Sequence, residues 1–181
     1  MSHSAEGPSA FAVGTTGRVT ADVAAVRYPS TAAAVTGTLD AVFDALPPDV
    51  AREVPLLVLA DAYSRWAAAR FARRCDEVGR QVRPSDSTGL ETAELVRRFG
   101  RARGWLGPCF LVARVDSAHG LRLARAMAAR GPVVMCQVSP LDLDSLTDPG
   151  CVVTAAVVTA ADDWDPALLD SGLPEMSGAR P

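Results

Sequence analysis

A histidine lies in the first turn of a predicted helix, within the stretch VARVDSAHGLRLARAMAARG at residues 112–131. His119 is one of two histidines in the chain, and Asp116 and Ser117 closely precede it. An imidazole can accept or donate a proton near neutral pH, and the two neighbours could orient it. Neighbours in one helical turn do not form a nucleophilic triad by sequence adjacency. His119 is therefore a proton-transfer or binding residue, a packed side chain, or the mark of a lost nucleophile.

Other chemical motifs are weak or missing. The chain has four widely spaced cysteines without a C-x-x-C pair, so we expect neither a zinc site nor a disulfide framework; they are Cys75, Cys109, Cys136 and Cys151. Cys109 begins a predicted strand without a basic neighbour, which favours a structural role. No dinucleotide fingerprint, P-loop or G-x-S-x-G elbow is present. The carboxylates of residues 142–148 are typical of a solvated turn. We expect no metal and no cofactor.

Apolar runs and helical periodicity alternate along the chain. Continuous apolar runs predict strands covered on both faces at residues 54–60, 108–115 and 132–139, a fourth strand at residues 151–160 and a short one before Gly14. Helices are predicted at residues 30–46, 61–79, 92–105 and 117–130, the first of them capped by Ser30. This alternation predicts one α/β domain over residues 10–160, with a mostly parallel sheet flanked by helices. We expect residues 1–9 to be flexible and residues 161–181 to form an acidic, Pro/Gly-rich tail.

Composition limits the classes of partner. The net charge is −3, which does not favour a nucleic-acid binder. No apolar run has the length of a membrane span, and the N-terminus lacks the pattern of a signal peptide, so we expect a cytoplasmic protein with no membrane partner. A basic cluster on and after the 92–105 helix is a candidate docking surface for an acidic partner, or else a solvated helix face. It consists of Arg97, Arg98, Arg101 and Arg103.

The stretch RGWLGPCFLVARVDSAHGLRLARAMAARGPVVMCQVSP, residues 103–140, resembles the β-ketoacyl synthases and, more closely, their chain-length factors. In that family a strand beginning with Gly-Pro leads to a nucleophile turn of the form V-D-[ST]-A-C, followed by a helix. Here Gly107 and Pro108 open the strand and residues 115–118 match the turn. His119 occupies the nucleophile's position. The resemblance covers residues 54–140, with weaker similarity at the ends.

The resemblance implies one half of a thiolase-like fold, without the active cysteine and without the histidines of the family's second half. It implies a non-condensing accessory protein in polyketide or fatty-acid-type biosynthesis that binds a ketosynthase subunit or an acyl carrier protein. The 117–130 helix is apolar on more than one side, which favours a homodimer or heterodimer that buries it. The alternative is a small enzyme acting on a carrier-bound acyl substrate by acyl transfer, dehydration or cyclisation. His119 would then be the general acid or base, oriented by Asp116 and Ser117.

Overall fold

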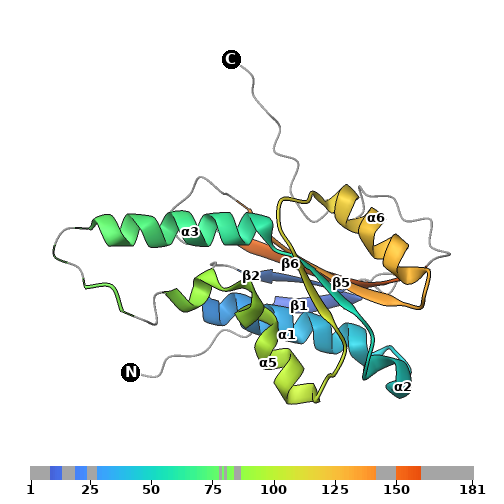
Figure 1. Ribbon diagram of the computed structural model, residues 1–181. Coiled ribbons are helices and arrows are strands. Elements are labelled where there is room, and N and C mark those ends of the chain that lie inside the picture. Colours follow the sequence, from blue (N-terminus) through green and yellow to red (C-terminus); the bar gives the residue numbers. More distant parts are fainter. Residues whose placement is uncertain are drawn as a thin grey trace.

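A computed structural model describes residues 9–13, 19–23, 28–77, 79, 81–83, 87–141 and 150–159, in which helices flank one sheet (Figure 1). Six strands form this sheet in the order β1-β2-β6-β5-β3-β4. They are β1 Ser9–Val13, β2 Val19–Val23, β3 Leu56–Leu59, β4 Cys109–Val112, β5 Val133–Pro140 and β6 Cys151–Val158. The predicted α/β class is confirmed. Residues 142–149 and 160–181, which include the acidic turn and tail of the sequence prediction, lie outside the described residues.

The sheet is mixed. β3 pairs in parallel with β4 and β5, as expected for strands joined by helices. β6 is antiparallel to β5, because residues 141–150 alone connect them and a parallel crossover needs a dozen or more residues. β1 and β2 form an antiparallel pair that extends the sheet beyond β6. The four strongest predicted strands are thus mostly parallel. The prediction of a mostly parallel sheet does not extend to all six described strands, because β1 and β2 add antiparallel pairs. The sequence predicted one strand in the region where these two lie.

The helices divide between the two faces of the sheet. They are α1 Tyr28–Asp44, α2 Pro48–Ala51, α3 Asp61–Asp76, the 3-10 turn η1 Thr88–Leu90, α5 Thr92–Arg103 and α6 Ser117–Ala128. Buried side chains of α1, α3 and α5 belong to the larger core cluster, whereas α6 packs on the opposite face against β3, β5 and β6. None of the described helices combines the length and the apolar character required to cross a bilayer.

The first helix shows how the sequence builds the larger core. Val35, Leu39, Val42 and Phe43 fall on the apolar face predicted for residues 30–46, and all four are buried. The Phe43 ring meets Phe99 of α5 edge-on, with ring centroids 4.7 Å apart. The helix begins at Tyr28, before the predicted cap Ser30, because a proline in the first helical turn is well tolerated.

β4 differs from the prediction for residues 108–115. A strand buried on both faces was expected, but β4 is the last strand of the sheet and pairs with β3 alone. Phe110 is 45% exposed and Leu111 is 43% exposed. A short apolar run has the same sequence pattern in the centre and at the edge of a sheet, so the pattern does not distinguish the two positions.

Candidate functional site

A cleft of about 440 Å³ opens at the carboxyl ends of the parallel strands, beside the N-terminus of α6. Open α/β sheets bind ligands at this edge. We call it the strand-end cleft. Its polar lining comes from the first turns of α3, from the start of α6 with its N-cap, and from β5: Asp61, Arg65, Asp116, Ser117, Gln137 and Ser139.

Gln137 lies at the centre of the polar lining. Its Nε2 donates to Ser117 Oγ and to Ser139 Oγ, each at 3.0 Å. Its carbonyl oxygen is buried and has no hydrogen-bond partner in the described part of the chain. An unpaired buried carbonyl is costly, so a hydrogen-bond donor entering the cleft would gain a ready acceptor.

Asp61 anchors the loop between β4 and α6. Its Oδ1 accepts a hydrogen bond of 3.0 Å from the backbone N–H of Arg114, and its Oδ2 lies 3.0 Å from Arg65 Nε. Arg114 has φ of +59°, a left-handed conformation that is uncommon for residues with a side chain. The hydrogen bond from the Arg114 N–H to Asp61 holds this conformation and thereby helps to set where Asp116 and Ser117 lie.

Asp116 and His119 form a pair at the start of α6. Asp116 is the N-cap residue, and its Oδ1 accepts a 2.7 Å hydrogen bond from the backbone N–H of His119. His119 Nδ1 lies 2.8 Å from the same oxygen and 2.9 Å from Oδ2. Hydrogen bonds from the His119 backbone and ring lower the pKa of Asp116. The two side chains are 63% and 65% exposed for His119 and Asp116, so the alternative of a packed His119 is wrong.

The structure brings the three predicted catalytic residues together at the start of α6, but only two of them line the strand-end cleft. Asp116 and Ser117 line the strand-end cleft, whereas His119 is not among the residues that line it. Ser117 accepts its hydrogen bond from Gln137, and Asp116 pairs with His119. Sequence reasoning missed Gln137 and Asp61. Both lie at the carboxyl end of a predicted strand, and this position could have identified them as candidate site residues.

Neither Cys109 nor Cys136 has the lowered pKa of an activated thiol. Cys136 and Cys151 are buried, and burial raises the pKa of Cys136 to about 12. Cys109 is exposed on β4, but partial desolvation of its thiol raises the pKa. Cys75 is exposed near the end of α3, away from the start of a helix. A thiol needs a lowered pKa to react readily at neutral pH, and neither Cys109 nor Cys136 has one.

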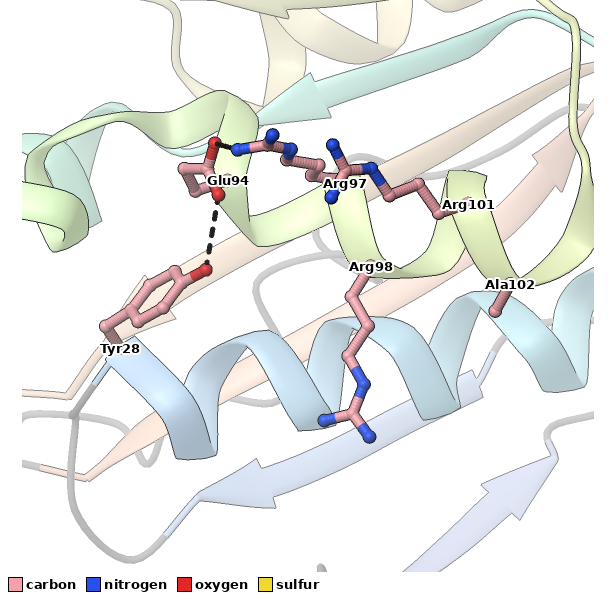
Figure 2. A pocket seen from close by; sticks show the side chains of 6 residues that line it. All are labelled: Tyr28, Glu94, Arg97, Arg98, Arg101 and Ala102. Carbon is pink, nitrogen blue, oxygen red and sulfur yellow. Dashed lines mark hydrogen bonds and ion pairs between the residues drawn. The ribbon is translucent and has the colours of Figure 1, made fainter.

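Three of the four predicted docking arginines lie around one hollow of about 480 Å³ on α5, shown in Figure 2. Arg97 pairs with Glu94 at 2.6 Å, and the Tyr28 hydroxyl donates to the other Glu94 oxygen at 3.5 Å. In the figure, Arg98 projects over α1 while Arg97 and Arg101 extend along the outer side of α5.

Arg103 does not join this group. Its guanidinium pairs with Asp40, at 2.8 Å, and with Asp44, both on α1. The predicted docking cluster therefore keeps three of its members, and the fourth ties α5 to α1.

The described residues contain no group of three His, Cys, Asp or Glu side chains placed to hold a metal ion. No protein-family model, no curated protein and no solved structure matches this chain. The resemblance to ketosynthases therefore rests on the residues quoted from the sequence.

Proposed function

We propose that this chain is a non-condensing, ketosynthase-like accessory protein in polyketide or fatty-acid-type biosynthesis, which binds a ketosynthase subunit or an acyl carrier protein. The position that resembles the family's nucleophile is His119, whose exposed ring pairs with Asp116. An imidazole at that position does not readily hold a transferable acyl chain. Binding, and not condensation, is the role that agrees with this site.

The outer edge of β4, which no described strand pairs with, is the observation that carries the proposal. On one side β4 pairs with β3, and its other edge bears the backbone N–H and C=O groups that a further strand would use. The sequence of β4 is CFLV, without the charge or proline that usually blocks such an edge. Phe110 and Leu111 are exposed there, and Leu106, just before the strand, is 64% exposed. An apolar open edge of this kind is typical of a subunit surface.

The helix α6 contributes less apolar surface than the sequence predicted. Leu121, Ala124 and Ala128 are buried against the sheet, and Leu123 is exposed at 39%. The face expected to be covered by a partner is thus largely covered by the chain's own strands. Association is therefore proposed through β4.

Light scattering after size-exclusion chromatography tests this association. The full chain is measured alone, with a ketosynthase subunit and with an acyl carrier protein. We expect a complex that Phe110→Lys abolishes, because the new charge would be buried between strands. Leu123→Lys is the matched control, since it places the same charge on an exposed leucine of α6. A protein that stays monomeric and binds neither partner would contradict the proposal. So would β-ketoacyl product formed by the chain alone from acyl- and malonyl-carrier protein.

A second function is favoured by one observation, the Asp116–His119 pair beside the strand-end cleft. In this alternative the chain is a small enzyme that transfers, dehydrates or cyclises a carrier-bound acyl group, with His119 as general acid or base. His119→Ala should then abolish turnover, while Arg122→Ala, on the same exposed turn, should not. If the chain converts no acyl thioester, this second function is wrong and the binding role stands.

A further inference from the structure

Tyr28 separates two neighbouring hollows and lines both of them. One is the arginine-lined hollow of Figure 2. The other, of about 490 Å³, lies between α3 and η1; its apolar lining includes Trp66, Phe71 and Leu90, and Arg70 and Arg74 line it as well. Because the two share Tyr28, they form a continuous surface with a cationic part and an apolar part. We call it the α3–α5 surface.

The cationic part carries unbalanced charge. Glu94 offsets Arg97, but Arg98 and Arg101 form no ion pair with another described side chain, and both are exposed. Arg103 lies close by in sequence and is already neutralised by Asp40 and Asp44. A local excess of positive charge in a chain of net charge −3 attracts an acidic partner.

The apolar part indicates what kind of acidic partner fits. Trp66 is only 3% exposed, and the Arg70 guanidinium lies over its ring, 5.2 Å from the centroid. The ring is therefore not an open platform on which a nucleic-acid base could stack. Aliphatic side chains can fill a hollow of this size without ring stacking.

We propose that the α3–α5 surface binds an acidic amphipathic helix of a partner protein, with apolar side chains in the α3–η1 hollow and carboxylates against Arg98 and Arg101. A helix of this kind presents apolar residues on one side, flanked by charge, which matches the adjoining apolar and cationic hollows. The inference rests on the proposed function, because it names a second surface, besides the β4 edge, through which such an accessory protein holds an acidic partner.

Fluorescence anisotropy of the full chain with a labelled synthetic peptide tests the surface. The peptide is a helix with leucines on one face and glutamates beside them; a scrambled peptide of the same composition serves as its control. We expect the helical peptide to bind more tightly than the scrambled one, and increasing salt to weaken it. The double variant Arg98→Glu/Arg101→Glu should weaken binding of the peptide roughly tenfold, because two exposed attractive contacts with its carboxylates become repulsive.

Arg122→Glu with Arg130→Glu is the matched control, because it changes net charge equally at two exposed arginines on and just after α6. We expect it to leave binding of the peptide unchanged. If both double variants weakened peptide binding equally, the proposal that the peptide binds at the α3–α5 surface would be wrong. Absence of peptide binding, or tighter binding of a single-stranded oligonucleotide than of the peptide, would also overturn it.

The same variants separate this inference from the proposed function. If a ketosynthase subunit or acyl carrier protein binds the wild type and the Arg98/Arg101 double variant equally, the surface is wrong and the proposed function stands. If the acidic helix binds at the α3–α5 surface but neither of those proteins does, the surface stands and the proposed function is wrong.

Discussion

Gly120 allows α6 to lie directly against β3, and its replacement by alanine tests that packing. An added Cβ would lie 2.2 Å from Leu59 Cδ1 and 3.0 Å from Cδ2, closer than carbon atoms approach one another. Leu59 is 5% exposed, so its side chain has little room to move away. Overpacking of this kind costs about 1–3 kcal/mol, and alanine regains up to about 1 kcal/mol in helix propensity. We expect Gly120→Ala to lower the free energy of unfolding by about 1–2 kcal/mol.

Urea denaturation followed by circular dichroism measures this change, with Gly100→Ala as the control. Gly100 is a helical glycine of α5 whose added Cβ would meet Trp105 at an ordinary 3.6 Å. That variant should be stabilised by up to about 1 kcal/mol, because only the helix propensity changes. If Gly120→Ala is as stable as the wild type or more stable, the close contact between α6 and β3 is wrong.

Three further predictions follow from buried or capping side chains. Thr38 Oγ1 is buried without a partner in the described part of the chain, so Thr38→Val should raise the free energy of unfolding by about 1 kcal/mol in urea denaturation. Burial raises the pKa of Tyr63 from 10.0 to about 12. Its stabilising contribution is complete below pH 10 and is lost as pH rises towards 12, and thermal unfolding across this range should show a smaller alkaline loss for Tyr63→Phe. A thiol introduced by His119→Cys would lie beside the Asp116 carboxylate, which disfavours the thiolate; adding Asp116→Asn should speed its alkylation at neutral pH, and an unchanged rate would contradict the pairing seen here.

The buried residues could be predicted from the sequence where apolar side chains repeat with the period of a helix. The face of α1 that carries Val35, Leu39 and Phe43 repeats with the helical period and is buried as predicted. Position 119 shows the limit. A strand–turn–helix pattern locates His119 in the first turn of α6, but whether its ring meets the cleft or solvent depends on the Asp116 cap, which adjacency alone does not reveal.

Contacts between residues that are far apart in the chain could not be predicted from the sequence. Arg103 was grouped with three nearby arginines because they are close in the chain, yet its guanidinium meets Asp40 and Asp44 from another helix. The Gln137 contact with Ser117 likewise joins β5 to α6. Such contacts depend on how the elements pack, and neither partner carries a local signal of the other.

The connection from β4 to α6 links the open edge to the strand-end cleft. β4 ends at Val112, and two residues later Arg114 adopts its left-handed conformation, held by Asp61 at the end of β3. The cleft-lining residues Asp116 and Ser117 follow at once. A strand added to β4 would pair with the four residues that lead directly into this segment. The open edge and the polar cleft are thus joined by a single short segment, residues 113–115.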